Sequence, residues 1–315
     1  MRGKLEITKD SFKSFLSDRN LILKGSIDKI EKLFSVKTIN DATKQDITFC
    51  RFEGDQGLQL LHKSSAGLIF IPKSLSESVE KKDTILISCE FPRLEMLRFL
   101  SMFWSENKLV DGYNIVANSS IHKTSIIDTN VQIGQYCVIG PGVIIKAGSQ
   151  IGSNCHIENV EIGKNARIAS SVTIGGSGFG FENDPLTKET LEFPHIGGIK
   201  IGDNVSIGSS ACIDRGGLGD TIIGDDVKID NLVHISHNVK IGNRCKVIAL
   251  AMVGGSVEIG DDSWISPSSA IRDWRKVGKD ALVGLGAVVT KDIEENSIVI
   301  GNPAKPIQKE VGRYK

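Results

Sequence analysis

Aliphatic side chains recur at every sixth position through most of the chain. The first run extends from Ile121 to Ile157 and resumes, after a slip of one residue, at Ile162. A short set begins at Ile201, and the longest run extends from Ile223 to Val289. Four residues after the aliphatic position stands a mostly small or β-branched side chain, as at Ser125, Val131, Cys137, Val143, Val227, Val233, Val239, Cys245 and Ala251.

This period of six excludes an α-helix, because the aliphatic positions would drift around a helix axis and share no face. It is typical of a parallel β-helix, in which short strands alternate with tight turns. Three hexads form one triangular coil, and successive coils stack at about 4.8 Å. Glycine often follows the aliphatic position, as in Ile133-Gly134 and Ile241-Gly242, where we expect it to supply the positive φ of the turns. The pattern predicts a mainly β fold, a left-handed parallel β-helix of hexapeptide repeats.

Residues 1–105 lack the hexads and mix helical and strand patterns. The apolar spacing of Ser11–Ser17 predicts an amphipathic helix, and a second helix is expected to begin at Pro92. The sequences GLIFIP at 67–72 and TILIS at 84–88 predict buried strands. A small α/β domain is therefore expected to precede the β-helix.

The patterns divide the chain into segments. We expect an α/β domain over 1–105, a linker over 106–120, the β-helix over 121–300 and a tail over 301–315. The repeat is interrupted by a long insertion at 175–199 and by the shorter DRGGLGD at 214–220. Insertions on a rigid solenoid often carry the function, so both are candidate binding elements.

Composition and charge exclude several classes of function. Glycine provides 33 of 315 residues while aromatics reach only 6%, which suits a narrow core with frequent turns. Lys and Arg balance Asp and Glu at 38 each, so no nucleic-acid partner is expected. Because the sequence has neither a long apolar run nor a secretory segment at its start, we expect no membrane span and a cytoplasmic protein. The six cysteines form no CxxC pair, which argues against a disulfide framework.

The segment DNLVHISHN at 230–238 is the candidate catalytic element. His237 takes the third place of the hexad that starts at Ile235, and Gly255, 18 residues later, is expected beside it on the next coil. A histidine above a groove bared by glycine suits a general base for the aminolysis of a thioester. A solvated surface histidine is the alternative. His234 is expected to support or orient rather than to react.

A zinc site would need a third ligand beside His234 and His237. The remaining histidines offer no convincing third ligand; these are His62, His122, His156 and His195. We therefore expect no metal and no permanently bound cofactor. No cysteine or serine stands out as a covalent nucleophile, which favours direct transfer within a ternary complex.

Four strings stand out in order along the chain: DITF at 46–49, IGGSGFGF at 174–181, IDRGGLGDTIIG at 213–224 and DNLVHISHNVKIG at 230–242. By these strings, and over nearly its whole length, the sequence resembles the UDP-3-O-(3-hydroxyacyl)glucosamine N-acyltransferases of lipid A and lipopolysaccharide biosynthesis. The segment FPRLEMLRFLSMF is also similar to the last N-terminal helix of that family.

The resemblance implies a homotrimer with active sites between subunits, His237 as the general base and the backbone N–H of Gly255 as the donor to the oxyanion. It also implies that residues 1–105 hold a uracil ring against aromatic side chains. The expected contacts to the nucleotide-linked amino sugar are Phe49, Phe52, Asp230, Asn231, His234, Asn238, Phe179 and Phe181.

The sequence departs from the family in two places, the uracil pattern and the second histidine. Its FxxNxxY uracil pattern reads here as Phe49, Phe52 and Asp55, so the nucleotide base could differ. A second family histidine aligns with Trp274, in a hexad that has Arg275 where a small residue belongs. The indole either shortens or redirects the acyl groove, or it merely covers a corner of the coil.

The C-terminal sequence resembles the ending of acetyl-CoA-dependent sugar and serine acetyltransferases, in which the stretch matching residues 301–305 lies beside CoA. The helical extension that grips acyl carrier protein is not seen in this sequence. The expected contacts to the acyl donor are Trp274, Lys291, Gly301, Asn302, Pro303 and Lys305.

Three functions therefore stay open. The first is an N-acyltransferase that moves an acyl group from acyl-CoA or acyl carrier protein to the amine of a nucleotide-linked amino sugar. The second is an acetyl- or acyl-CoA-dependent N-acetyltransferase of a dideoxy-amino sugar for surface polysaccharide. The third is a non-catalytic scaffold that binds a nucleotide sugar.

Overall fold

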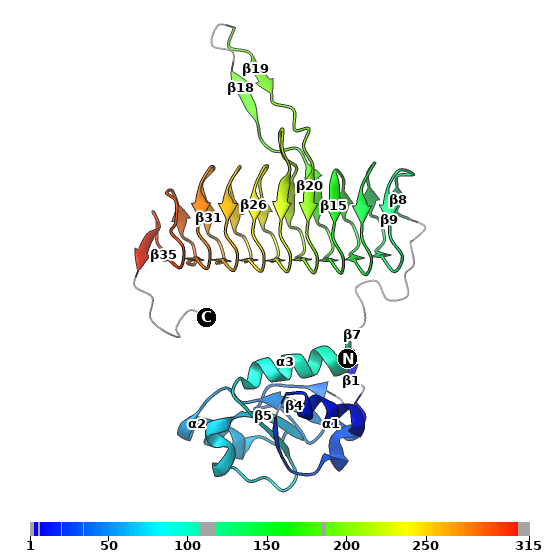
Figure 1. Ribbon diagram of the computed structural model, residues 1–315, viewed down its shortest axis with the longest axis vertical. Coiled ribbons are helices and arrows are strands. Elements are labelled where there is room, and N and C mark those ends of the chain that lie inside the picture. The colour runs from blue at the N-terminus through cyan, green and yellow to red at the C-terminus, as the bar shows by residue number, and fades with distance from the viewer. Residues whose placement is uncertain are drawn as a thin grey trace. The chain divides into compact units, whose positions relative to one another are not determined.

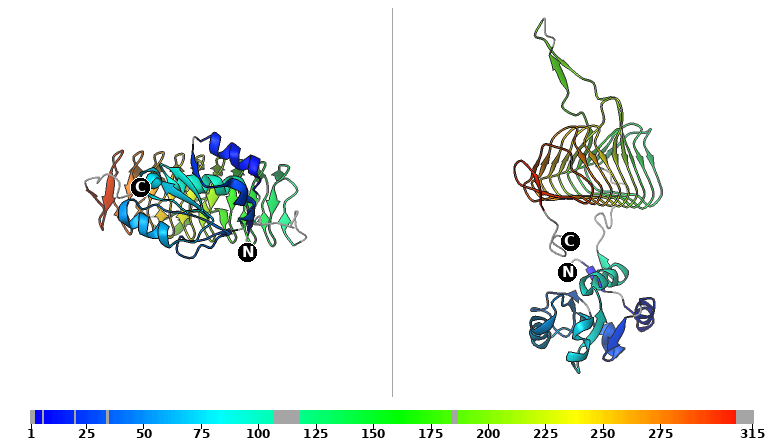
Figure 2. Two further views of the ribbon diagram at one scale, coloured as in Figure 1. Left: turned by 90° about the horizontal axis from the view of Figure 1, so that it is seen from below. Right: turned by 60° about the vertical axis from the view of Figure 1, so that its left-hand side comes forward.

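The computed structural model describes residues 3–5, 7–19, 21–33, 35–106, 118–183 and 187–307. The chain forms two compact units, Met1–Lys108 and Leu109–Lys315 (Figures 1 and 2). Most of the expected linker, residues 107–117, and the last part of the expected tail, residues 308–315, lie outside the described residues. Among the helices that are described, none is both long and apolar enough to cross a bilayer.

The first unit is built on a five-stranded sheet with the order β2-β6-β5-β4-β3. Only β2 runs antiparallel to its neighbour. A separate antiparallel pair joins β1 (Gly3–Leu5) to β7 (Trp104–Glu106). The sheet strands are β2 (Ile22–Lys24), β3 (Ser35–Val36), β4 (Asp46–Phe49), β5 (Leu68–Pro72) and β6 (Ile85–Cys89). The helices are α1 (Lys9–Ser17), α2 (Gly54–Lys63) and α3 (Pro92–Phe103), with 3₁₀ turns η1 (Ile27–Lys32) and η2 (Lys73–Ser78).

The predicted helices and strands of this unit are confirmed as α1, α3, β5 and β6. Helix α2 was not predicted, although Leu58 and Leu61 stand three residues apart on its inner side. A cluster of phenylalanines packs edge to face around Phe99, which is fully buried. This unit therefore has an aromatic core, whereas the core of the described β-helix coils is aliphatic.

The second unit is a left-handed parallel β-helix with three sheets, each named here by its first strand, and this confirms the predicted fold. The β8 sheet contains β8 (Ser120–Ile121), β11 (Val138–Ile139), β14 (His156–Ile157), β17 (Thr173–Gly176), β22 (Cys212–Asp214), β25 (His234–Ile235), β28 (Met252–Val253), β31 (Ala270–Ile271) and β34 (Val288–Val289). The β9 sheet contains β9 (Ile126–Ile127), β12 (Ile144–Ile145), β15 (Val160–Ile162), β20 (Ile199–Ile201), β23 (Thr221–Ile223), β26 (Lys240–Ile241), β29 (Glu258–Ile259) and β32 (Lys276–Val277). The β10 sheet contains β10 (Gln132–Ile133), β13 (Gln150–Ile151), β16 (Arg167–Ile168), β21 (Ser206–Ile207), β24 (Lys228–Ile229), β27 (Lys246–Val247), β30 (Trp264–Ile265), β33 (Leu282–Val283), β35 (Ile298–Ile300) and β36 (Lys305–Ile307).

The register of strand pairing explains why the period of six predicted the fold. Ile235 pairs with Val253, and Ile241 with Ile259, so residues 18 apart are neighbours on successive coils. The aliphatic and small positions of each hexad fill one continuous buried core. Cys137 and Cys155 are both buried in it, and all six cysteines are free thiols, as expected. Burial raises the pKa of the Cys245 thiol to about 11.

Glycine has the expected positive φ at Gly142, Gly148 and Gly286, but it has a different role where it follows the aliphatic position. Gly134 and Gly242 do not have a positive φ. A Cβ on Gly134 would lie 2.6 Å from the backbone nitrogen of Ser153 on the next coil, so glycine is required by the close approach of the coils. The left-handed residues stand two positions later and are often polar, as at Asn154, Asn204, Asp226, Ser256 and Asp262.

The two insertions leave the β-helix near its middle. The longer one extends as an antiparallel hairpin, β18 (Phe181–Asn183) with β19 (Thr190–Glu192), which projects from the coils in Figures 1 and 2. The shorter one, 214–220, stays close to the coils between β22 and β23. Both border the same region of the surface, which contains His237.

Candidate functional site

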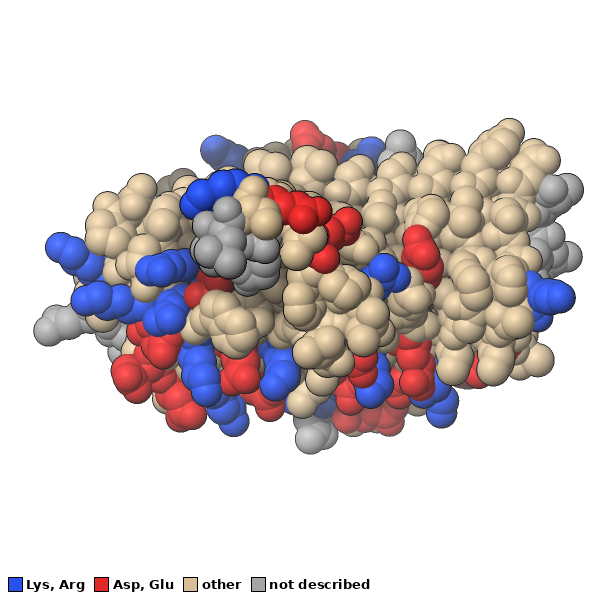
Figure 3. Space-filling model, turned by 90° about the horizontal axis from the view of Figure 1, so that it is seen from above, with Lys and Arg blue, Asp and Glu red and all other residues tan. Residues whose placement is uncertain are grey.

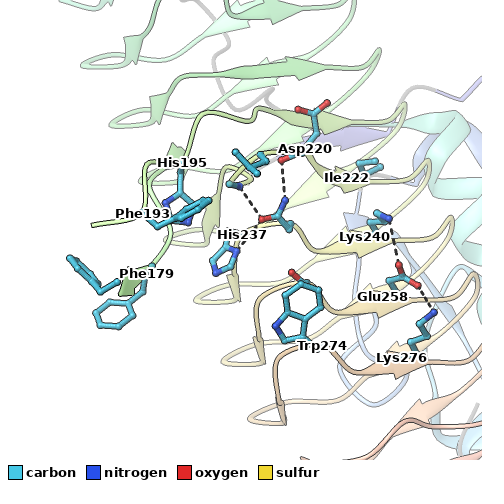
Figure 4. Close-up of a pocket in the computed structure, with 17 residues that line it drawn as sticks. Phe179, Phe193, His195, Asp220, Ile222, His237, Lys240, Glu258, Trp274 and Lys276 are labelled. Carbon is cyan, nitrogen blue, oxygen red and sulfur yellow. Dashed lines mark hydrogen bonds and ion pairs between the residues drawn. The ribbon is translucent and has the colours of Figure 1, made fainter. Parts of the chain in front are cut away.

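A pocket of about 990 Å³ lies where the two insertions meet the corner between the β8 and β9 sheets (Figure 4). The insertion 175–199 contributes aromatic side chains, and the insertion 214–220 contributes backbone. The coils supply His237, Asn238, Ser256 and Trp274 from three successive corners. The remaining wall is formed by charged residues of the β9 sheet, in which Glu258 lies between Lys240 and Lys276.

His237 follows β25 and is half-buried in this pocket. Its Nδ1 lies 3.1 Å from Oδ1 of Asn238. Oδ1 also accepts the backbone N–H of Gly217 at 2.9 Å, while Nδ2 of the same amide donates to the carbonyl of Gly219 at 3.0 Å. These two backbone contacts fix the orientation of the amide, so Nδ1 of His237 must donate to an oxygen. The proton therefore resides on Nδ1, which leaves Nε2 as a proton acceptor.

Asn238 connects His237 to the shorter insertion. Besides the contacts of its amide, its backbone N–H donates to Oγ1 of Thr221 at 2.9 Å. Thr221 in turn donates to the carbonyl of Asp214 at 2.9 Å, so residues 214–221 form a frame around the asparagine. The sequence predicted that Asn238 contacts substrate. Its amide oxygen contacts protein groups, Gly217 and His237, while the residue also lines the pocket, so its contact to substrate stays a prediction.

Gly255 lies beside His237, where the 18-residue spacing predicted it. A Cβ at this position would be 2.8 Å from both Cε1 and Nε2 of the imidazole, so only glycine leaves room for the ring. The N–H of Gly255 was expected to be free for an oxyanion. It donates instead to Oδ1 of Asp273 at 2.8 Å, so the free donor of that prediction does not exist in this conformation. Asp273 stands 18 residues after Gly255, so the repeat places it on the next coil, and the same contact recurs from Asp225 to Asn243 and from Asn243 to Asp261.

His195 is the residue of the pocket that the sequence reasoning dismissed. Its ring lies 5.0 Å from that of His237, at an interplanar angle of 65°. It is only 4% exposed, and Phe193 packs against its other side. The two histidines are 42 positions apart in the sequence, with a non-repetitive insertion between them, so periodicity could not have paired them.

The predicted aromatic residues do line the pocket. Phe179 is 86% exposed and its ring packs against Phe181 at a centroid distance of 4.9 Å. Trp274 is 72% exposed, has a positive φ of 62° and donates its backbone N–H to the carbonyl of Gly255 at 2.9 Å. Its neighbour Arg275 reaches Asp292 at 3.2 Å instead of entering the core.

A buried carboxyl group lies behind the pocket. Burial raises the pKa of Asp214, an effect that His234 and His237 oppose. Nε2 of His234 is 3.6 Å from Oδ2 of Asp214, and Sγ of Cys212 is 3.8 Å from Oδ1. These three residues offer ligand atoms within 4.8 Å of one another and are the group in the described chain that could hold a metal ion. His234 thus contacts Asp214 and is not among the residues that line the pocket.

Several predicted contacts lie elsewhere. Asp230 and Asn231 occupy the corner between the β10 and β8 sheets, where their side chains accept backbone N–H groups, so we assign them a turn-capping role. Lys291, Gly301, Asn302, Pro303 and Lys305 are exposed at the C-terminal coils, whereas Ala304 is partly buried against the core. None of these residues lines the pocket.

Phe49 and Phe52 belong to the first unit. They line a separate pocket of about 390 Å³, together with Arg51 and Arg93. The guanidinium group of Arg51 lies 5.1 Å from the centroid of the Phe52 ring. Asp55 lies in the first turn of α2, is exposed and does not line this pocket. This cavity combines aromatic surface with positive charge, which suits an aromatic base attached to phosphate.

Comparison with known families supports the β-helix assignment. A family model described as bacterial transferase hexapeptide (six repeats) matches residues 142–176 and 220–255. The fold is also similar to the UDP-N-acetylglucosamine O-acyltransferase of Moraxella catarrhalis, with a TM-score of 0.57 and 26% identity over 61% of this chain and 73% of that chain. A Francisella novicida UDP-N-acetylglucosamine acyltransferase gives a TM-score of 0.56 and 28% identity over 61% and 69% of the two chains.

Sequence relatives are more specific. The UDP-3-O-acylglucosamine N-acyltransferase of Caulobacter sp. strain K31 is 33% identical over 148 residues, which are 47% of this chain but only 43% of that protein. The protein of that name from Bordetella pertussis is 28% identical over 84% of this chain and 79% of its own length. The Bordetella alignment is long enough to include both units. The chain is therefore similar in its repeats to the hexapeptide transferases, and in sequence to proteins named UDP-3-O-acylglucosamine N-acyltransferase.

Proposed function

We propose that this protein is an N-acyltransferase that moves an acyl group from a thioester to the amine of a nucleotide-linked amino sugar. One observation carries the proposal: the Nδ1 of His237 is bonded to Asn238, so Nε2 is left as a base beside the bare backbone of Gly255. The sequence relatives bear the name of this activity.

The reaction proceeds without a covalent enzyme intermediate. The sugar amine attacks the thioester carbonyl, a C–N bond forms, and Nε2 of His237 takes the proton that the amine loses. The tetrahedral intermediate then collapses, the C–S bond breaks, and the thiolate leaves with the proton that the imidazolium returns. Asp214 lies close enough to influence this charge, since its carboxyl group interacts with both His234 and His237.

Gly255 serves the reaction first by its missing side chain. Its N–H becomes an oxyanion donor only if Asp273 releases it, because one N–H group does not serve two strong acceptors at full strength. We therefore place the movement of the Asp273 side chain before the acyl transfer step.

The donor is an acyl thioester of CoA or of acyl carrier protein. Lys291 occupies the same corner column as His237, three coils further on, which corresponds to about 14 Å. An extended donor laid along this column would bring its phosphates to Lys291 and, beyond it, to Lys305. Both lysines and the turn Gly301-Asn302-Pro303 remain predicted donor contacts.

A second candidate is transfer of a short acyl group from CoA to a dideoxy-amino sugar. The observation that favours it is Trp274, whose largely exposed indole lies in the pocket one corner beyond Ser256. A bulky ring at this point shortens the space available to a long acyl chain.

The acceptor nucleotide is proposed to bind the aromatic and basic pocket of the first unit at Phe49 and Phe52. We further propose a homotrimer. The outward residues on the described strands of the β8 sheet are uncharged apart from the histidines and the buried Asp214, whereas those of the β9 sheet include Glu161, Lys200, Lys240, Glu258 and Lys276. Figure 3 shows one face of the molecule, on which charged side chains crowd along one side and leave a broad area without them. An uncharged face of this kind suits contact between subunits.

The function is tested with purified protein and a panel of nucleotide-linked amino sugars, each combined with acetyl-CoA, longer acyl-CoA and hydroxyacyl carrier protein. Release of free thiol and the mass of the sugar product are measured together. Turnover only with the carrier protein supports the first function, and turnover with short acyl-CoA supports the second. Nucleotide-sugar binding without turnover by any donor would leave the scaffold function.

A further inference from the structure

The buried imidazole of His195 packs edge-on against the imidazole of His237. The ring centroids are 5.0 Å apart and the planes meet at 65°. His195 is 4% exposed although it belongs to a projecting insertion, in which Phe179 is 86% exposed. The insertion thus turns one side chain inward, onto the proposed base (Figure 4).

The backbone on both sides of His195 is anchored. The N–H of Phe193 donates to the carbonyl of Gly180 at 2.9 Å, which continues the hairpin ladder. The N–H of Ile196 donates to the carbonyl of Gly217 at 2.8 Å, which ties the segment to the shorter insertion. Because Gly217 also donates to Asn238, the same insertion fixes the positions of both histidines.

Two glycines bring main chain against the rings. A Cβ on Gly178 would lie 2.6 Å from Cδ2 of His237 and 2.8 Å from Nε2 of His195. A Cβ on Gly180 would lie 3.1 Å from Cε1 of His195. The chain at 178–180 therefore lies close to both rings, and a side chain at Gly178 would displace them.

The hydrogen bonding of the His195 ring does not indicate that this residue serves only to stabilise the fold. Its Nδ1 is buried and has no hydrogen-bond partner within the part of the chain that is described. A buried polar atom without a partner costs about 1–3 kcal/mol. The ring is held in place by packing, and what it packs against is the proposed base.

We propose that His195 is a positioning residue of the acyl transfer: its buried ring fixes the plane of the His237 imidazole, so that Nε2 faces the acceptor amine. This inference rests on the proposed function. Nδ1 of His237 is held by Asn238, but a single hydrogen bond allows the ring to swing about it, and the His195 ring removes this freedom. A base displaced by about 1 Å can lose 10²-fold in rate.

The test compares three variants. His195→Ala removes the ring, His195→Phe keeps an aromatic ring without nitrogens, and His122→Ala is a matched control at an exposed histidine of the first coil. We expect His195→Ala to lower kcat by roughly 10- to 100-fold with KM changed less than about twofold. His195→Phe should restore kcat to within about threefold of the wild-type value. The control, His122→Ala, should have the kcat of the wild type.

Wild-type kcat in His195→Ala would overturn the inference. So would equal losses in the Ala and Phe variants, which would mean that the nitrogens of His195 matter rather than its ring. Thermal unfolding of each variant separates a loss of fold from a loss of positioning.

A second readout does not depend on turnover. The ¹⁵N imidazole spectrum of His237 should report one Nδ1–H tautomer in the wild type and in His195→Phe, and averaged tautomers in His195→Ala. An unchanged spectrum in His195→Ala would contradict the inference. If the wild-type protein turns over no donor at all, the proposed function fails, and this spectrum still decides the positioning of His237.

Discussion

The two units of this protein are stabilised in opposite ways. The first has a sheet covered by helices, with Phe12, Phe15, Phe70 and Phe103 grouped around Phe99. These contacts join residues far apart in sequence, so the core forms as a whole. The β-helix has an aliphatic core in which each coil contacts only its neighbours. A periodic core tolerates insertions between coils, and the proposed site lies where two such insertions meet.

The difference implies that a change at a β-helix corner can abolish the function and leave the fold intact. His237→Ala is the strongest test. If His237 is the base, kcat should fall by roughly 10²- to 10⁴-fold, because no other group takes the proton from the amine at that position. Steady-state rates and the far-ultraviolet circular dichroism spectrum are measured together. Near-normal turnover would remove His237 from the mechanism.

The complementary test changes the stability of the first unit by removing a side chain from its core. Phe99→Ala should lower the free energy of unfolding of this unit by about 3–5 kcal/mol, because it opens a cavity at the centre of the aromatic cluster. Ile259→Val, in a β-helix coil, should cost about 0.5–1.5 kcal/mol. Denaturant titration followed by hydrogen exchange would locate each loss. A single transition lowered equally by both changes would show that the units do not unfold independently.

Gly255→Ala tests the close contact at the corner. The added methyl group would lie 2.8 Å from the His237 ring, so the imidazole must move. We expect kcat to fall by roughly 10- to 100-fold with little change in stability. Gly176→Ala is the control, since its Cβ would meet only Oδ1 of Asp214, at 3.8 Å. Equal effects of the two changes would show that steric contact with His237 is not the cause.

The smallest expected effect concerns pH. In the first unit, burial alone would raise the pKa of Asp46, but hydrogen bonds from Ser35 and Thr43 outweigh it and the pKa lies below its ordinary value of 3.8. In the β-helix, burial raises the pKa of Asp214 above 3.8. Asp46 therefore stabilises its unit above pH 3.8, and this stabilisation is lost as the pH falls through the lowered pKa. Asp214 has the opposite effect, because stability declines as the pH rises from 3.8 through the raised pKa.

Unfolding titrations between pH 2 and pH 7 measure this difference. Asp46→Asn should cost about 2 kcal/mol at pH 7 and progressively less in acid. Asp214→Asn should match the wild type in acid and gain stability over it toward neutral pH. If both variants changed the free energy of unfolding in the same direction at pH 7, the contrast between Asp46 and Asp214 would be contradicted.

The β-helix was predictable from sequence because its register is arithmetic. Residues 18 apart become neighbours, so Ile235 finds Val253 and His237 finds Gly255 without knowledge of any other contact. Helices α1 and α3 were also predictable, since their apolar faces follow the helical period. Helix α2 begins at a glycine and contains a second one, which weakens the local signal.

Tertiary structure decided what lies outside the repeat. The inward turn of His195 and the hold of residues 214–221 on Asn238 depend on single backbone contacts between distant segments. None of these contacts leaves a periodic trace in the sequence. The sequence alone thus determined the scaffold and the position of the proposed base, because repeated coils fix their own neighbours. The surroundings of that base were decided only by the path of two irregular insertions, which long-range hydrogen bonds and close packing select.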